Sequence, residues 1–151
     1  MKNTKGFTLI ELLAVIVILA IIALIATPMI LGVIDSAKKG ASESSAYGYV
    51  DAVEKSTLKN MLANASEAKI VDDTYTISDA GKTLTGTKEV GTPAAPVVIK
   101  VDFKGKNPEN GGKVVVDGGE IKLAQLTING YKVEYDGKTA KVVENFSAIE
   151  G

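Results

Sequence analysis

The chain has 151 residues, of which 46% are hydrophobic, and its formal net charge at pH 7 is −1. All 17 basic residues are lysine, and arginine, histidine, cysteine and tryptophan are absent. These absences exclude disulfides, thiolate or imidazole metal ligands, a cysteine nucleophile and a Ser-His-Asp triad. The chain has no excess of basic residues and no arginine to form a bidentate fork, so nothing in its composition indicates nucleic-acid binding. We therefore expect a non-enzymatic protein with no metal, no cofactor and no nucleic-acid partner.

The hydrophobic residues are concentrated near the N-terminus. From Phe7 to Ile34, 23 of 28 residues are apolar, and the 23 residues from Leu12 to Ile34 carry no charge. A helix of 23 residues is about 34 Å long at about 1.5 Å per residue, which exceeds the roughly 30 Å of a bilayer core. The sequence therefore predicts a membrane-spanning helix. Because Lys2 and Lys5 precede it, the positive-inside rule places the N-terminus in the cytoplasm and the rest of the chain outside.

Two simpler interpretations of this segment fit less well. A secretory signal peptide has an apolar core of about 7–15 residues and a small-x-small cleavage site, whereas this run is longer and no such pair ends it. A plain uncleaved anchor agrees with the hydropathy but leaves Glu11 unexplained.

Glu11 is a carboxylate inside the apolar stretch. A charge at bilayer depth costs on the order of 2–4 kcal/mol, so it normally has a partner. Lys5 lies on the far side of the helix axis. An α-amino group at Phe7 is a better partner, and it would exist if the chain were cut after Gly6. Phe7 and Glu11 are an i,i+4 pair in one helix, and the amine of one copy could also reach the carboxylate of a neighbour.

The segment Lys5-Gly6-Phe7-Thr8-Leu9-Ile10-Glu11-Leu12-Leu13, followed by a long apolar run, resembles the N-terminus of a type IV prepilin. The resemblance covers about residues 1–40. It implies that Gly6 ends a leader cut by a membrane-embedded prepilin peptidase. It also implies that Phe7 becomes the N-methylated N-terminus and that Glu11 neutralises the Phe7 amine of a neighbouring subunit.

The resemblance also places a helix kink at Pro28. Proline removes one N–H and clashes with the carbonyl four residues earlier, which is that of Leu24. Gly32 adds a second weak point, about 1 kcal/mol worse than alanine in a helix. The alternative is simple tolerance of both residues in a membrane helix.

Beyond Asp35 the helix is expected to continue to about residue 64. Apolar or small residues recur there at spacings of three and four, as in an amphipathic helix. This stripe consists of Ala46, Val50, Val53, Thr57 and Met61, and Leu58 and Leu62 are expected to widen it.

After Ala68 the apolar period changes to two, which predicts an antiparallel sheet over about 70–146. The predicted strand faces are Val71, Tyr75 and Ile77; Val97, Ile99, Val101 and Phe103; Val114 and Val116; Tyr131, Val133 and Tyr135; and Ala140, Val142 and Phe146. Asp136-Gly137 is the clearest hairpin turn. Residues 123–126 break the alternation and predict a helical turn or a bulge, and Gly105 to Gly112 is predicted to be a surface loop.

Two short patterns carry no site. Gly81-Lys82-Thr83 and Gly137-Lys138-Thr139 end like a phosphate-binding loop but lack its first glycine. Asp72-Asp73 lacks the pattern of a calcium loop, and successive residues of a strand point to opposite faces.

These observations predict an α+β fold in which a long N-terminal hydrophobic and amphipathic helix packs on a C-terminal antiparallel sheet. The expected divisions are a cleaved leader over 1–6, a transmembrane and assembly helix over 7–34, and an extracytoplasmic head over 35–151. The resemblance implies a plasma-membrane precursor that is expected to polymerise with copies of itself into a surface pilus. A prepilin peptidase and methyltransferase, an assembly ATPase and a membrane platform protein are the implied partners.

Two other functions stay open at this point. One is a pseudopilin or minor pilin of a type II secretion or DNA-uptake system. The other is a membrane-anchored extracellular binding module that never polymerises.

Overall fold

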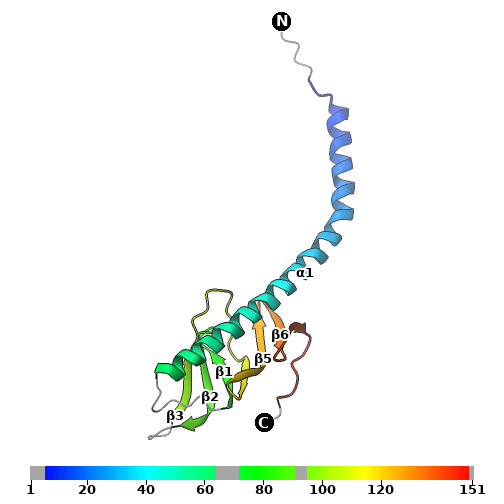
Figure 1. The fold of residues 1–151 in the computed structure, drawn as a ribbon. Coiled ribbons are helices and arrows are strands. Elements are labelled where there is room, and N and C mark those ends of the chain that lie inside the picture. The colour runs from blue at the N-terminus through cyan, green and yellow to red at the C-terminus, as the bar shows by residue number, and fades with distance from the viewer. Residues whose placement is uncertain (1–5, 64–71, 91–94, 150–151) are drawn as a thin grey trace. The chain divides into compact units, whose positions relative to one another are not determined.

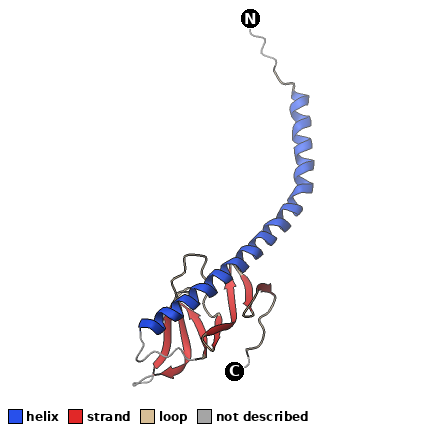
Figure 2. Cartoon of the chain, viewed as in Figure 1, coloured by secondary structure: helices blue, strands red, loops and turns tan. Residues whose placement is uncertain are grey.

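The computed structural model describes residues 6–63, 72–90 and 95–149, apart from the side chains at positions 61, 63 and 90. It contains one long helix followed by a seven-stranded antiparallel sheet, shown as ribbons in Figure 1 and by secondary structure in Figure 2. The predicted α+β class and the predicted order, helix first and sheet second, are confirmed.

Helix α1 runs from Leu9 to Ala63 and has 55 residues. It continues through Pro28 and Gly32 without interruption. The chain divides into two compact units, Met1–Ala37 and Lys38–Gly151. The N-terminal part of α1 belongs to the first unit and its C-terminal part to the second, and each unit is described by itself.

In the first unit, polar side chains of α1 bond back to their own helix. Thr27 Oγ1 donates to the Ala23 carbonyl at 2.7 Å, and Ser36 Oγ donates to the Gly32 carbonyl at 3.0 Å. Such i−4 bonds satisfy a hydroxyl within the helix itself. The hydroxyl groups of Thr27 and Ser36 therefore need no hydrogen-bond partner from outside the helix.

The second unit contains the sheet, in the strand order β3-β2-β1-β4-β5-β6-β7 with every described pairing antiparallel. The strands are β1 (Asp73–Ser78), β2 (Thr83–Val90), β3 (Ala95–Lys100), β4 (Lys113–Asp117), β5 (Glu120–Ile128), β6 (Tyr131–Tyr135) and β7 (Ala140–Val143). The predicted hairpin at Asp136-Gly137 joins β6 to β7, with Gly137 at a φ of 86°.

The core lies between the C-terminal part of α1 and one face of the sheet. The predicted stripe forms part of it, because Ala46, Val50, Val53 and Thr57 are all buried, and the unpredicted Tyr49 and Ala52 of α1 are buried as well. The side chain of Met61 lies outside the described part of the chain. Leu58 and Leu62 do not widen the stripe as predicted, since they are 56% and 83% exposed. A helix that lies on a sheet buries a face of limited width.

Several sheet predictions need correction. Strand β2 was not predicted, because its sequence TLTGTKEV carries little apolar alternation, and among its described side chains at positions 83–89 only Leu84 is large, apolar and buried. Strand β3 ends at Lys100 rather than continuing to Phe103, and Phe146 lies beyond the end of β7. Val71 lies outside the described residues.

Residues 123–126 belong to strand β5, and no helical turn forms there. The register of β4 and β5 shifts between Val115, which faces Leu123, and Val116, which faces Ile121. One extra residue, Lys122, therefore sits in β5 just before the predicted segment, as in a bulge.

The connection from Val101 to Gly112 was predicted in part as a surface loop, yet several hydrogen bonds anchor it, including backbone bonds of Val101, Gly111 and Gly112. Pro108 is among the fully buried residues. Asn110 Oδ1 accepts from the Ala80 amide at 2.7 Å, and the Glu109 amide donates to the Thr127 carbonyl at 2.8 Å. These contacts fix the loop against the turn after β1 and against β5.

Candidate processing and assembly site

The helix start carries a capping box that links Thr8 to Glu11. The Glu11 amide donates to Thr8 Oγ1 at 3.3 Å, while the Thr8 amide and hydroxyl donate to Glu11 Oε2 at 2.8 and 2.7 Å. A Ser or Thr at the N-cap with Glu three residues later satisfies two of the amides that a helix start leaves unpaired. Glu11 therefore has an intrachain partner before any second copy is present.

Sequence reasoning missed this partner because it looked only for cations. The signal was in the sequence, since Thr8-Leu9-Ile10-Glu11 matches the Ser/Thr-x-x-Glu pattern of a capping box. The partner is a neutral donor, so it satisfies one carboxylate oxygen without neutralising the charge. Both bonds to the Glu11 side chain end on Oε2.

Gly6 and Phe7 precede the helix. Neither residue is helical, both are exposed, and the Phe7 side chain is 88% exposed. A side chain added at Gly6 would meet nothing within 4 Å. The bond between these residues thus lies in accessible, non-helical backbone, and positions 1–5 lie outside the described residues.

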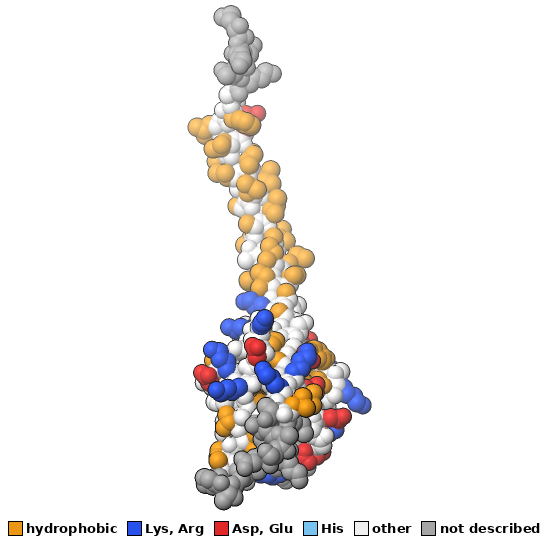
Figure 3. Space-filling view, turned by 60° about the vertical axis from the view of Figure 1, so that its left-hand side comes forward, with side chains coloured by type: hydrophobic (Ala, Val, Ile, Leu, Met, Phe, Trp, Pro, Cys, Tyr) orange, Lys and Arg blue, Asp and Glu red, His pale blue; other side chains and the backbone are white. Residues whose placement is uncertain are grey.

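The N-terminal part of α1 exposes its large apolar side chains. Eighteen of them between Leu9 and Ile34 are at least 43% exposed, and Figure 3 shows hydrophobic side chains along this part of the helix. By length and composition α1 could cross a membrane. Exposed apolar surface of this extent requires a covering of lipid or protein.

Pro28 and Gly32 lie in this apolar stretch, and a Cβ added at Gly32 would meet nothing within 4 Å. Open space beside Gly32 means that no intrachain contact requires glycine there. The predicted kink at these positions stays a prediction.

Two carboxylates, those of Asp73 and Glu134, accept hydrogen bonds that join separate segments of the head. Asp73, only 7% exposed, accepts from the amides of Thr74, Thr87 and Lys88 at 2.6–2.8 Å and from the Thr87 hydroxyl. Burial raises the pKa of this carboxyl, but the four hydrogen bonds together hold it below its ordinary value. A side chain at Gly86 would meet Asp73 Oδ2 at 2.7 Å, so glycine is needed at that point.

Glu134 holds the C-terminal residues that follow β7. Its carboxylate accepts from the Ser147 hydroxyl at 2.6 Å, the Ser147 amide at 2.8 Å and Gln125 Nε2 at 3.2 Å. The hydrogen bond from the Ser147 hydroxyl is the main reason that the pKa of Glu134 lies below its ordinary value. In a chain without cysteine, this contact supplements sheet pairing near the C-terminus.

Among the residues that the structure describes, no group of three or more His, Cys, Asp or Glu side chains is arranged to hold a metal ion. Asp72 Oδ1 instead accepts from the Gly118 amide at 2.8 Å. Asp72 and Asp73 thus take part in separate backbone contacts.

A family model described as the prokaryotic N-terminal methylation motif matches residues 1–27. No curated protein and no solved structure gives a significant match to the chain. The motif supports a type IV pilin-like protein made as a precursor. Together with the single apolar N-terminal helix, it fits a single-pass precursor anchored in a membrane.

Proposed function

We propose that this chain is the structural subunit of a type IV pilus. The observation that carries the proposal is the combination of the methylation motif over residues 1–27 with an N-terminal helix whose apolar side chains are exposed. The chain acts by polymerising and has no enzymatic activity of its own. Its partners are further copies of itself and the membrane machinery that processes and assembles them.

Apolar burial holds the fibre together once it has left the membrane. Each large aliphatic side chain removed from water contributes about 1.5–3 kcal/mol, and nineteen large apolar side chains between Phe7 and Ile34 are exposed in the single chain. Lipid covers them in the precursor, with the N-terminus in the cytoplasm. In the fibre the same side chains pack helix against helix, and residues 35–151 lie outside. Leaving lipid is not spontaneous, so an assembly ATPase and a membrane platform protein supply the work.

Processing prepares the first residues for that packing. A prepilin peptidase cuts after Gly6, and the new amine at Phe7 is methylated. The exposed, non-helical backbone at Gly6 and Phe7 supports access for the peptidase. The capping box uses Oε2 of Glu11, and Oε1 of the same carboxylate accepts the Phe7 amine of a neighbouring subunit.

Electron microscopy of sheared surface material tests the proposal. Cells that make the chain should carry thin fibres that contain it as the main protein, and cells that lack it should carry none. If the chain is instead a pseudopilin or minor pilin of a secretion or DNA-uptake system, cells that lack it should still carry fibres, or the main protein of the fibres should be a different one. A binding module that never polymerises would stay in the membrane fraction.

A further inference from the structure

We propose that the heads of neighbouring copies dock through two oppositely charged grooves that lie on opposite flanks of the C-terminal part of α1. The groove lined by lysines in one copy receives the groove lined by carboxylates in the next copy. This inference rests on the proposed function, because it names the contact between heads in the fibre.

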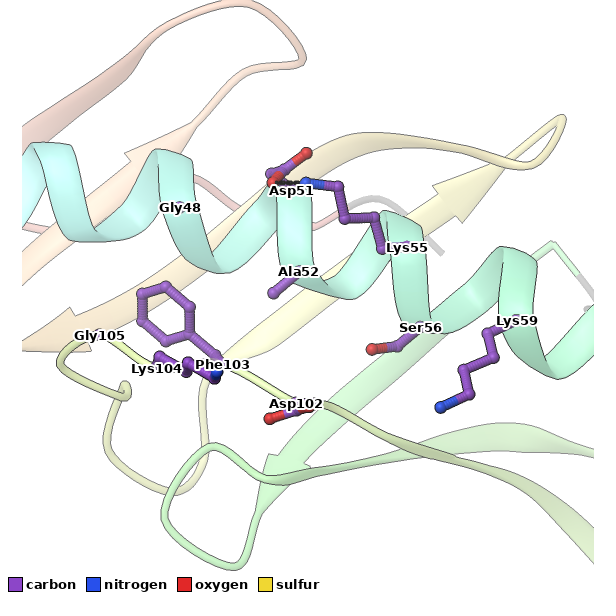
Figure 4. A pocket seen from close by; sticks show the side chains of 10 residues that line it. All are labelled: Gly48, Asp51, Ala52, Lys55, Ser56, Lys59, Asp102, Phe103, Lys104 and Gly105. Atoms are coloured by element: carbon purple, nitrogen blue, oxygen red, sulfur yellow. Dashed lines mark hydrogen bonds and ion pairs between the residues drawn. The ribbon is translucent and has the colours of Figure 1, made fainter.

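The lysine groove consists of two adjoining hollows of about 470 and 410 Å³ that share Ser56 and Lys59. Helix α1, strand β3 and the chain just after β3 form its walls, and Figure 4 shows the larger hollow. Its charged lining residues are Asp51, Lys55, Lys59, Lys100, Asp102 and Lys104. Lysine charges therefore exceed carboxylates by two.

Within this groove one lysine is already paired. Lys55 reaches back along the helix to Asp51, as Figure 4 shows, and forms an ion pair with it. No ion pair of Lys59, Lys100 or Lys104 is found within the described residues. The positive charge of these three side chains is available to an external partner, and Val98, which is 48% exposed, supplies an apolar contact beside them.

The acidic groove has a volume of about 370 Å³ and lies where α1 passes the turns after β4 and β6. Glu54 and Glu120 are its charged lining residues, and Leu58, 56% exposed, lies next to Glu54 on α1. Glu54 and Asp136 both raise the pKa of Tyr135 in this groove, after the larger effect of burial. The charged side chains that line the groove, Glu54 and Glu120, therefore favour a positively charged partner.

The charges around the acidic groove also give an excess of two, of the opposite sign. Asp117 ends β4 and Asp136 follows β6, so the groove and the segments next to it hold four carboxylates and two lysines, Lys122 and Lys138. Lys122 pairs with Glu120 at 2.6 Å. The net charges of the two grooves are thus equal in magnitude and opposite in sign. Each groove also has one exposed aliphatic residue, Val98 in the lysine groove and Leu58 in the acidic groove.

A second copy of the chain is the occupant that these features fit. Different surfaces on one subunit produce a head-to-tail contact that repeats along an open helical assembly. An apolar centre with a charged rim is the usual composition of a protein–protein interface. A nucleic acid would match the lysine groove alone and would leave the acidic groove without a role.

Charge reversal and charge exchange test this contact in the full-length chain made in cells. Lys59→Glu with Lys104→Glu places acids in both grooves, and Glu54→Lys with Glu120→Lys places bases in both. Because opposed like charges cost several kcal/mol, we expect each pair to lower the yield of sheared fibres by at least about tenfold. The four changes together restore opposite signs and should restore most of that yield.

Two controls separate docking from folding and from general charge effects. Each variant must accumulate in the membrane fraction to the wild-type level. Lys82→Glu with Lys113→Glu changes the net charge equally, yet these lysines line neither groove, so the fibre yield should not change. Because ionic strength screens charges at a surface, the fibre yield of each reversed pair should be higher at high salt than at low salt.

Specific results would overturn the inference. A normal fibre yield in both double variants would contradict the proposed contact. So would a quadruple variant whose fibre yield is no higher than that of either double variant. Retention of double-stranded DNA by wild-type fibres, lost in the lysine variants whose fibres are normal, would assign the groove to a nucleic acid. Absence of fibres from wild-type cells would instead contradict the proposed function.

Discussion

Glu11 combines two physical roles that one substitution can separate. Its carboxylate completes the capping box with Thr8, and its charge is the proposed partner of a neighbouring Phe7 amine. Glutamine also completes a capping box but carries no charge. The pair Glu11→Gln and Glu11→Ala therefore distinguishes helix capping from charge neutralisation.

We expect both variants to accumulate in the membrane with folded heads and to form fewer than about one-tenth of the wild-type fibres, since an unpaired buried charge costs several kcal/mol. The amount of each variant in sheared and membrane fractions measures this. Thr8→Ser keeps the hydroxyl and should assemble normally. Normal fibres from Glu11→Gln together with few from Glu11→Ala would show that Glu11 acts only as a helix cap.

The Asp73 carboxylate makes head stability depend on pH. Its pKa in the folded head lies below the ordinary value of 3.8. A depressed pKa adds stability that is complete above the unfolded pKa and is lost as the pH falls through the folded pKa. The free energy of unfolding of the head should therefore decrease when the pH is lowered below about 4.

Asp73→Asn should reduce that dependence and leave the part that the lowered pKa of Glu134 contributes. It should also weaken the head at neutral pH. An amide group would face the amides of Thr87 and Lys88, which now donate to Oδ2. Unsatisfied buried donors cost about 1–3 kcal/mol each. Thermal unfolding of the detergent-solubilised chain, followed by circular dichroism between pH 2 and 7, measures both effects. An unchanged midpoint at pH 7 would contradict the role assigned to this carboxylate.

At the scale of elements, α1 closes the exposed edge of strand β7. The Ala140 amide donates to the Tyr47 hydroxyl at 2.8 Å, and the Val142 amide donates to Glu43 Oε1 at 2.9 Å. Unpaired amides on an edge strand invite pairing with another chain. Two helix side chains therefore take the place of a further strand at this edge.

Removing these acceptors should loosen β7. Tyr47→Phe and Glu43→Ala each delete one acceptor, which costs about 0.5–1.5 kcal/mol per hydrogen bond. Hydrogen exchange of the Ala140 and Val142 amides should accelerate severalfold in the matching variant. Glu43→Gln keeps an acceptor oxygen and serves as the control. Equal exchange in Glu43→Ala and Glu43→Gln would mean that the carboxylate does not hold this edge.

Secondary structure was predictable wherever apolar periodicity was strong. The buried stripe of α1 and the hairpin joining β6 to β7 both follow from local pattern and turn chemistry. Strand β2 was not predictable, because it is held by pairing on both sides and by the contact of Asp73 with Thr87 and Lys88 rather than by its own apolar residues. Long-range contacts of that kind leave no periodic signal.

For the candidate site, the sequence predicted the apolar helix and the residues Gly6, Phe7 and Glu11 as one motif. It could not predict the two grooves, because their charges come from segments far apart in the chain, such as Lys59 on α1 and Lys100 on β3. Only the packing of α1 on the sheet brings those lysines together.

For the complete chain, the proposed function gives the same helix two environments, first lipid and then other copies. The hydrophobic side chains between Phe7 and Ile34 are exposed in the single chain, and the methylation motif covers the residues that would be processed between these two states. Cutting after Gly6 removes Lys2 and Lys5. In the proposed function the cut also creates the amine that pairs with Glu11, so processing and assembly are linked.

Mass spectrometry of the N-terminal peptide, in both the membrane and the sheared fractions, tests this account most directly. We predict a chain that begins with N-methylated Phe7 in the sheared fibres, and Gly6→Leu should leave an uncut chain confined to the membrane. Sheared fibres whose subunits still begin at Met1, or a Gly6→Leu variant that yields a Phe7 N-terminus, would contradict it.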